Sequence, residues 1–291
     1  MRIAFIGLGM MGRPMAERLI AGGFSVRVND ADLGLADAFG PAWAGTPAEA
    51  AREAEVLITM LPTGGIVREV LLGTGEAALA LPSGAVVIDC SSSEAAGTVA
   101  LGADLAARGI TLVDAPVSGG VPLAREGKLT LMVGGTDDTL LARLGPILGQ
   151  IGGRIVPVGP LGAGHAAKAI NMAIAACTLA ATCEGLALGA RFGLDPATLL
   201  EVINNSTGRS AVGETVIRNH VLPRTYAQGF ALALMTKDVG LADGMRGYLG
   251  LHLPLLEATH AQWRDALAEL GTATDFSEYN RYVENHLEDP A

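Results

Sequence analysis

The sequence feature that most constrains the fold is a glycine-rich turn near the N-terminus. It directly follows an apolar run, Ile3–Ile6, and precedes a segment with helical spacing, Met11–Ala21. In such a strand–turn–helix unit the first glycine permits a tight turn, and the second lets a pyrophosphate approach the backbone. The third lets the helix pack close to the sheet, and the helix N-terminus favours phosphate. The pattern predicts a dinucleotide site whose cofactor-binding residues are Gly7, Leu8, Gly9, Met10, Met11 and Gly12.

An acidic residue at the end of the second strand makes this motif more specific than a lone GxGxxG. Asp30 follows the apolar run Val26–Val28 and is placed to accept hydrogen bonds from an adenosine ribose. Its neighbour Ala31 offers no positive charge to a 2′-phosphate, so the sequence predicts NAD in preference to NADP. Arg27 lies close by in sequence and leaves NADP open as the weaker alternative.

Strands and helices alternate through the first half of the chain, which predicts a mostly parallel α/β sheet covered on both faces. Ligands bind such sheets beyond the carboxyl ends of the strands, so later strand ends are expected to contact the cofactor as well. The apolar runs are Ile3–Ile6, Val26–Val28, Val56–Met60, Ala85–Asp89, Thr111–Asp114, Leu129–Val133 and Ile155–Pro157. The further cofactor contacts predicted are Asn29, Met60, Leu61, Pro62 and Ser91.

The alternation stops near residue 160, where a different architecture begins. Residues 165–192 form one helical stretch about 40 Å long, and the segments beyond it show no strand period. We therefore predict an α/β Rossmann-like N-terminal domain, a long inter-domain helix and an all-α C-terminal domain. The expected boundaries are 1–161, 162–192 and 193–291, with the last domain binding substrate and supporting a homodimer or homotetramer.

Composition excludes several classes of protein. With 20 Lys+Arg against 30 Asp+Glu, the net charge of −10 suits neither nucleic acid nor an anionic membrane. The apolar stretch Ala166–Ala190 carries charged and amide side chains, which favours a buried helix over a membrane span. Three cysteines without CxxC spacing predict no disulfide framework and no metal site, and the chain opens without a signal peptide. We expect a soluble, cytoplasmic protein.

Four motifs extend the argument over essentially the whole chain. In chain order they are Gly7–Ala16 (GLGMMGRPMA), Asp114–Gly120 (DAPVSGG), Gly162–Asn171 (GAGHAAKAIN) and Lys237-Asp238 after Gly229-Phe230. Together they resemble the β-hydroxyacid dehydrogenase family, which includes 3-hydroxyisobutyrate and tartronate semialdehyde dehydrogenases. The resemblance implies reversible, NAD-dependent oxidation of a short 3-hydroxy acid to its semialdehyde.

Lys168 is the expected catalytic residue. It lies one turn from the start of the long helix, where the helix dipole and burial both disfavour the ammonium form and lower the pKa of the lysine. Such an amine suits proton exchange with an alcohol, and the resemblance implies this role. The structural alternative is a lysine that reaches solvent or pairs with a carboxylate.

The resemblance also implies the substrate contacts. Ser118, Gly119 and Gly120 would hold the substrate carboxylate, Asn171 would orient the reacting oxygen, and Lys237 would reach the nicotinamide or substrate. Many family members carry a second amide where this chain has Met172, which leaves the division of asparagine contacts open. A surface amide at Asn171 and a surface ion pair at Lys237 are the alternatives. His165 is not assigned a catalytic role.

Two other functions remain to be weighed. One is an NAD(P)H-dependent reductase of another carbonyl or an imine, and the other is a non-catalytic dinucleotide-binding scaffold. Lys168 argues against both, because imine reductases usually lack it and an inactive relative would be expected to lose it. The acid itself stays undecided among hydroxyisobutyrate, glycerate, hydroxypropionate and serine, since a pocket discriminates a methyl group by only about 1–3 kcal/mol.

Overall fold

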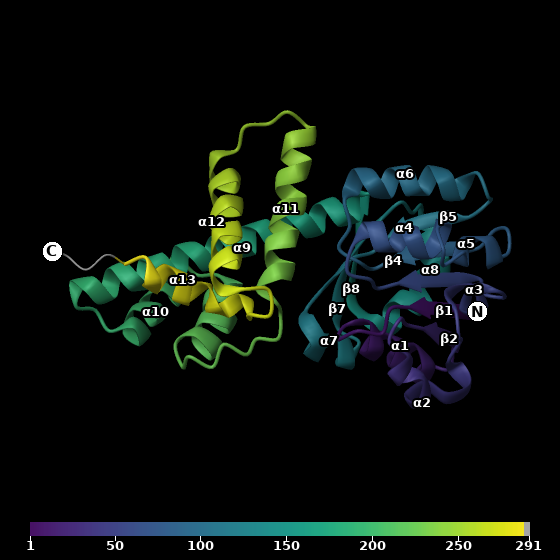
Figure 1. Ribbon diagram of the computed structural model, residues 1–291, viewed down its shortest axis with the longest axis horizontal. Coiled ribbons are helices and arrows are strands. Elements are labelled where there is room, and N and C mark those ends of the chain that lie inside the picture. The colour runs from purple at the N-terminus through teal and green to yellow at the C-terminus, as the bar shows by residue number, and fades with distance from the viewer. Residues whose placement is uncertain (288–291) are drawn as a thin grey trace. The chain divides into compact units, whose positions relative to one another are not determined.

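The computed structural model describes residues 1–287 and contains two compact units (Figure 1). The first unit runs from Met1 to Lys168, and the second begins at Ala169. Helix α9 (Ala163–Phe192) crosses this boundary, so its first turns belong to the first unit and its remainder to the second. A parallel-dominated sheet with covering helices, a long helix and a helical C-terminal region confirm the predicted fold class.

The first unit is built on one sheet with the strand order β2-β1-β3-β4-β5-β7-β6, and β8 pairs with β7. The strands are β1 (Arg2–Ile6), β2 (Ser25–Asn29), β3 (Val56–Thr59), β4 (Val86–Asp89), β5 (Thr111–Asp114), β6 (Val117–Ser118), β7 (Leu129–Gly134) and β8 (Gly152–Gly159). Strands β1 to β5 pair in parallel, whereas β7 pairs antiparallel with β5 and β6. The sequence predicted the mostly parallel character, but strand direction at this edge does not follow from apolar runs.

Both faces of this sheet are buried, which explains the continuous apolar runs. Ile3 and Phe5 of β1 pack in one core with residues of α1 and α8, while Ala4 and Ile6 pack in a second core with residues of α3, α4 and α6. The helices of this unit are α1 (Gly12–Ala21), α2 (Ala36–Phe39), α3 (Pro47–Ala51), α4 (Gly64–Leu72), α5 (Ala77–Ala80), α6 (Ala95–Ala106), α7 (Gly120–Glu126) and α8 (Asp138–Ile151).

The strand order reverses at β1, because the chain passes from β1 to β2 on one side and then to β3 on the other. In open α/β sheets a ligand binds at such a reversal, beyond the carboxyl ends of the strands. Here those ends are the turn after Ile6 and the loop after Thr59, which lie next to each other because β1 and β3 pair in register.

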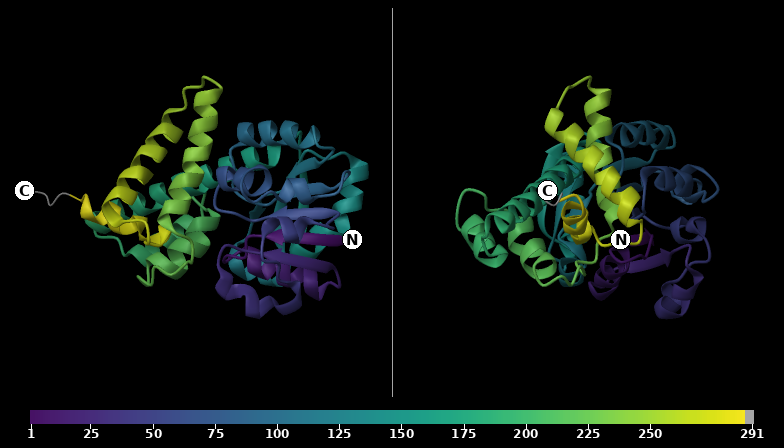
Figure 2. Two further views of the ribbon diagram at one scale, coloured as in Figure 1. Left: turned by 45° about the vertical axis from the view of Figure 1, so that its right-hand side comes forward. Right: turned by 60° about the vertical axis from the view of Figure 1, so that its left-hand side comes forward.

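The second unit consists of helices and connecting loops in its described residues, with one isolated β-bridge between Ala231 and Asp275. Helices α11 and α12 lie side by side in both views of Figure 2 and are joined by residues 249–253. The elements after α9 are α10 (Pro196–Asn204), η3 (Gly213–Val221), α11 (Leu232–Tyr248), α12 (Pro254–Leu270), η4 (Phe276–Glu278) and α13 (Tyr279–Asn285). The sequence predicted only that this domain is all-α. Element η3 is a π-helix, which apolar spacing does not distinguish from an α-helix.

Helix α9 is long and apolar enough, by length and composition alone, to cross a membrane. Its buried side chains include Ala176, Leu179 and Cys183, and they pack in the core of the second unit with Trp263. The indole of Trp263 stacks on the ring of Tyr279 with centroids 4.6 Å apart. This packing makes α9 the central core helix of that unit.

Candidate active site

The glycine turn after β1 has the geometry that a pyrophosphate requires. Gly7 has φ +99°, and a Cβ atom there would strike the carbonyl of Met60, which directly follows β3. A Cβ atom at Gly12 would strike the carbonyl of Gly7 and lie 3.2 Å from the ring of Phe5. At Gly9, by contrast, a Cβ atom would meet nothing within 4 Å. Two glycines are therefore required by packing, and the third opens space for a ligand.

Asp30 is held rigidly beside this turn. Its Oδ2 accepts a hydrogen bond from the N–H of Leu8 at 2.5 Å, and its Oδ1 accepts one from the N–H of Asp32 at 2.8 Å. The carboxylate is thus fixed at the carboxyl end of β2 and remains partly exposed. A fixed acceptor at this place can bind the hydroxyls of an adenosine ribose.

Two of the predicted cofactor residues use their side chains to support the backbone. The Asn29 amide is buried and donates to the carbonyl of Ala44 at 2.9 Å. The Ser91 hydroxyl is also buried and accepts from the N–H of Leu61 at 2.9 Å, which shapes the loop after β3. Met60, Leu61 and Pro62 follow β3 in that loop, and the carbonyl of Met60 lies against Gly7 of the glycine turn. Their contact with a cofactor stays a prediction. Sequence reasoning placed Asn29 and Ser91 at the correct strand ends, but strand position does not reveal where a side chain bonds.

The loop predicted to hold a carboxylate follows β6. Ser118 ends this two-residue strand and pairs with Thr130 of β7. Gly119 has φ +137° and Gly120 has φ +69°, conformations that strain any other residue. Ser118 is half-buried and the two glycines are exposed, so this short segment can offer a hydroxyl and backbone N–H groups to an anion.

The first turn of α9 is pinned to the sheet by a residue that the sequence analysis recorded only as part of a motif. Asp114, at the end of β5, accepts from the N–H of Gly162 at 2.9 Å and from the N–H of His165 at 2.8 Å. Lys168 lies one turn further along α9 and is half-buried. The first unit therefore contains the glycine turn, Asp30, the Ser118 loop and Lys168.

The remaining predicted site residues belong to the second unit. Asn171 lies three residues after Lys168, and therefore on the same side of α9, where its side chain is exposed. Lys237 lies on α11, and its Nζ is 3.0 Å from Oδ1 of the buried Asp238. The ion pair between these neighbours is the arrangement that the sequence analysis weighed as the alternative to a site role.

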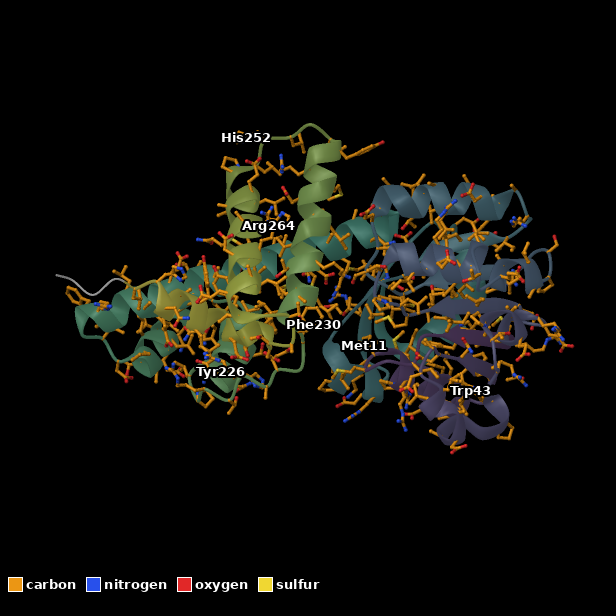
Figure 3. All side chains as sticks on the ribbon, in the orientation of Figure 1. Met11, Trp43, Tyr226, Phe230, His252 and Arg264 are labelled. Carbon is orange, nitrogen blue, oxygen red and sulfur yellow. The ribbon has the colours of Figure 1, made fainter. Side chains whose placement is uncertain are left out.

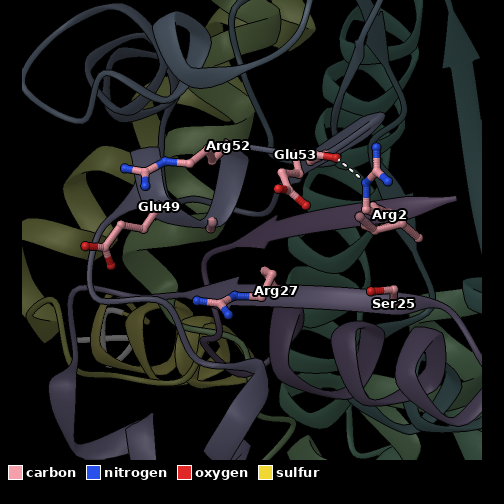
Figure 4. A pocket seen from close by; sticks show the side chains of 9 residues that line it. Arg2, Ser25, Arg27, Glu49, Arg52 and Glu53 are labelled. Carbon is pink, nitrogen blue, oxygen red and sulfur yellow. Dashed lines mark hydrogen bonds between the residues drawn. The ribbon is translucent and has the colours of Figure 1, made fainter.

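A hollow at the other end of the sheet does not contain the predicted site residues. It is lined by Arg2 and Ser25 at the starts of β1 and β2, by Arg27, and by α3 with Arg52 beyond it (Figure 4). Arg2 Nε donates to the carbonyl of Glu53 at 2.7 Å. The side chain of Arg27 lies in this hollow, whereas the residues after β2 that face the glycine turn do not line it.

Comparison with known proteins agrees with this arrangement. The family described as the NAD binding domain of 6-phosphogluconate dehydrogenase matches residues 2–159. The family described as the NAD-binding of NADP-dependent 3-hydroxyisobutyrate dehydrogenase matches residues 162–283. The chain belongs to the β-hydroxyacid dehydrogenase family. Members of this family are NAD(P)-dependent enzymes that oxidise hydroxy acids, and this activity is assigned to the chain.

Individual relatives cover nearly the whole chain. The 2-(hydroxymethyl)glutarate dehydrogenase of Eubacterium barkeri is 38% identical over 244 residues, covering 83% of this chain and 81% of that protein. The human mitochondrial 3-hydroxyisobutyrate dehydrogenase is 34% identical over 290 residues, covering 97% and 86%. The solved structure of Mycobacterium tuberculosis 3-hydroxyisobutyrate dehydrogenase with L-serine matches with a TM-score of 0.89 and 33% identity, covering 97% of this chain and 98% of that one.

Substitution by alanine should have different effects at two glycines of the turn, Gly9 and Gly12. Gly9→Ala should leave the free energy of unfolding within about 0.5 kcal/mol of the original and weaken NAD binding at least about tenfold, because the new methyl group fills the open space. Gly12→Ala should lower the free energy of unfolding by about 1–3 kcal/mol through overpacking. Urea unfolding and calorimetric titration with NAD measure both. Unchanged NAD affinity in Gly9→Ala would contradict the assignment of this turn.

Proposed function

We propose that this dehydrogenase oxidises a short 3-hydroxy acid of the 3-hydroxyisobutyrate type to its semialdehyde, reversibly and with NAD. The observation that carries the proposal is the attachment of α9 to the sheet by Asp114, which places Lys168 in the same unit as the glycine turn. The α9 turn is anchored at the carboxyl end of β5, and the glycine turn follows the carboxyl end of the parallel strand β1, so both lie at the same edge of the sheet. This supports Lys168 as the proton-exchanging group.

The names of the relatives share one chemical fragment. 2-(Hydroxymethyl)glutarate and 3-hydroxyisobutyrate each carry a primary alcohol on the carbon next to the one that bears a carboxylate. L-Serine, present with the Mycobacterium tuberculosis enzyme, contains the same HOCH₂–CH–COO⁻ unit. The three molecules differ in the substituent on the central carbon. This supports a substrate of the form HOCH₂–CH(R)–COO⁻, with R left to the pocket.

The proposed division of labour follows from the residues. Bound NAD supplies the acceptor for the hydride that leaves the alcohol carbon. The Lys168 amine takes the proton of the hydroxyl during oxidation and returns it during reduction. Ser118 and the N–H groups of Gly119 and Gly120 bind the substrate carboxylate. From the second unit, Asn171 orients the reacting oxygen and Lys237 completes the pocket. This assignment divides the chain into three functional parts. Residues 1–161 bind the dinucleotide, residues 162–192 form the inter-domain helix, and residues 193–291 bind substrate and support oligomerisation.

Lys168→Ala is the direct test of this mechanism. Turnover of a panel of 3-hydroxy acids, followed by NADH production, should fall by at least about a thousandfold, because the base is lost. The affinity for NAD should stay within about twofold, since the glycine turn is untouched. A loss of turnover of only a few-fold would remove Lys168 from the mechanism.

Ser118→Ala is the matched variant for that experiment. It removes a carboxylate contact and leaves the amine in place, so it should chiefly raise KM with a smaller effect on kcat. A panel of hydroxyisobutyrate, glycerate, hydroxypropionate and serine then identifies R by kcat/KM. If no member of the panel reduces NAD in the unmodified protein, the proposed substrate class is wrong.

The fixed carboxylate of Asp30 predicts a preference for NAD over NADP. A 2′-phosphate placed beside it would meet like charge, so NAD should bind at least about tenfold more tightly, or about 1.4 kcal/mol. Asp30→Asn should reduce this ratio. Arg27→Ala is the control and should leave the ratio unchanged, because that side chain lies in the hollow at the other end of the sheet. Tighter binding of NADP by the unmodified protein would contradict the role of Asp30.

We also propose that the chain forms a homodimer or homotetramer through its helical unit. We propose that it acts in the cytoplasm, which its three free cysteines support, because that compartment keeps thiols reduced. The end of the α11–α12 hairpin, where Figure 3 labels His252, exposes several large apolar side chains, Tyr248, Leu249, Leu251, Leu253 and Leu255. Several exposed large apolar side chains close together in the chain favour an interface at this end of the hairpin. Sedimentation equilibrium should report an oligomer, and Leu255→Lys should shift it towards monomer. A monomer in the unmodified protein would rule this assembly out.

A further inference from the structure

A buried side chain, that of Asp89, links the ends of two neighbouring strands. Asp89 ends β4 and pairs in register with Thr59, which ends β3. The exposed fractions are 2% for Asp89 and 0% for Thr59, and the Thr59 hydroxyl donates to Oδ1 of Asp89 at 2.9 Å. Nε2 of His165 lies 3.6 Å from Oδ2 of Asp89, beyond hydrogen-bond distance. The carboxyl ends of β3 and β4 are thus joined by a side-chain hydrogen bond that is shielded from solvent.

The same side chain holds the loop that follows β4. Its Oδ1 also accepts from the N–H of Ser91 at 3.0 Å, and its Oδ2 accepts from the hydroxyl of Ser93 at 2.9 Å. Both serines are buried, with exposed fractions of 1% and 4%. Because Asp89 bonds to residues two and four positions further along the chain, it fixes the path of this loop.

Ser91 and Ser93 in turn contact the segment that follows β3. The Ser91 hydroxyl accepts from the N–H of Leu61 at 2.9 Å. A Cβ atom at Gly64, the first residue of α4, would lie 3.0 Å from Cβ of Ser93 and 3.2 Å from its hydroxyl oxygen, so the start of α4 packs directly on that side chain. The loop after β3 is therefore held by two serines that Asp89 itself holds.

These two loops lie on the side of β1 opposite Asp30. In the strand order β2-β1-β3-β4, Asp30 follows β2 and the loops follow β3 and β4, at one edge of the sheet because the four strands are parallel. A dinucleotide with its pyrophosphate on the glycine turn and its adenosine ribose at Asp30 would extend its nicotinamide half over β3 and β4. The two loops are thus placed to contact that half.

We propose that Asp89 is a positioning residue for the nicotinamide half of the dinucleotide, which acts by holding the loops after β3 and β4 in the conformation that binds it. Thr59, Ser91 and Ser93 transmit this effect through their bonds to the carboxyl group. The proposal rests on the proposed use of NAD and on its predicted site, and is independent of the substrate and of Lys168.

The physical reason is the ordering of the two loops. Without the Asp89 carboxyl group, three donors lose their acceptor and both loops can adopt other conformations. Binding of the nicotinamide half must then order them again, which lowers affinity. The adenosine half does not depend on this, because Asp30 is held by its own hydrogen bonds to the N–H groups of Leu8 and Asp32.

Calorimetric titration with NAD and with ADP separates the two halves, since ADP contains the adenosine and the diphosphate alone. In Asp89→Ala the affinity for NAD should fall at least about tenfold, and the affinity for ADP should stay within about twofold. Asp89→Asn keeps one acceptor oxygen and should recover part of the affinity for NAD. An unchanged affinity for NAD in Asp89→Ala, or equal losses for NAD and ADP, would overturn the proposal.

Ser93→Ala is the second variant, which decides the matter if Asp89→Ala does not fold. It removes one bond to Asp89 and keeps the Cβ atom that packs against Gly64. The affinity for NAD should fall about threefold or more, with the affinity for ADP unchanged. An unchanged affinity for NAD in the folded variant would overturn the proposal.

Asp137→Ala is the control for simple loss of stability. Asp137 caps α8 in the same unit by accepting from the N–H of Leu140 at 2.7 Å. This variant should lower the melting temperature and leave both affinities unchanged. A loss of NAD affinity equal to that of Asp89→Ala would make the role of Asp89 merely structural.

The unmodified protein distinguishes this proposal from the proposed function. If it binds NAD but oxidises no hydroxy acid, the proposed function fails, and the titrations of the Asp89 variants still decide the role of Asp89. If it binds ADP and NAD with equal affinity, the nicotinamide half makes no net contribution to binding and the role of Asp89 is overturned.

Discussion

The hydrogen bonds between the carboxylate of Asp114 and the start of α9 are the interaction on which the position of Lys168 depends. The carboxylate accepts the N–H groups of Gly162 and His165 and thereby ties the start of α9 to the end of β5. The first N–H groups of a helix have no hydrogen-bond partner within the helix, so an acid at this place can accept from them. Its negative charge also interacts favourably with the positive end of the helix dipole. Lys168, which lies one turn further along α9 within the same unit, takes its position from this attachment.

The dinucleotide site is organised in the same way, by backbone groups that side chains hold in place. Asp30 accepts the N–H of Leu8 within the glycine turn, and Ser91 accepts the N–H of Leu61 in the loop beside it. Gly7 and Met60 approach so closely that no Cβ atom fits between them. Contacts within the protein thus fix the backbone of both the turn and the loop.

The neighbouring thiol shows how far this region is removed from water. Burial, with a smaller contribution from the charge of Asp89, strongly raises the pKa of Cys90. A thiol that stays protonated is neither a nucleophile nor a metal ligand. The chemistry proposed for this chain uses other groups, namely the amine of Lys168, the Ser118 loop and a dinucleotide that accepts hydride.

Local patterns in the sequence determined the strand–turn–helix at Gly7–Gly12, the acid at Asp30, the two-sided burial of the sheet and the long helix. These features depend on spacings of a few residues, which the chain displays directly. Tertiary structure alone decided the meeting of Asp89, Asp114 and His165, and the inward turn of the Asn29 and Ser91 side chains onto the backbone. Such contacts join positions that are distant in the chain, and they arise only when strand pairing and loop packing bring those positions together.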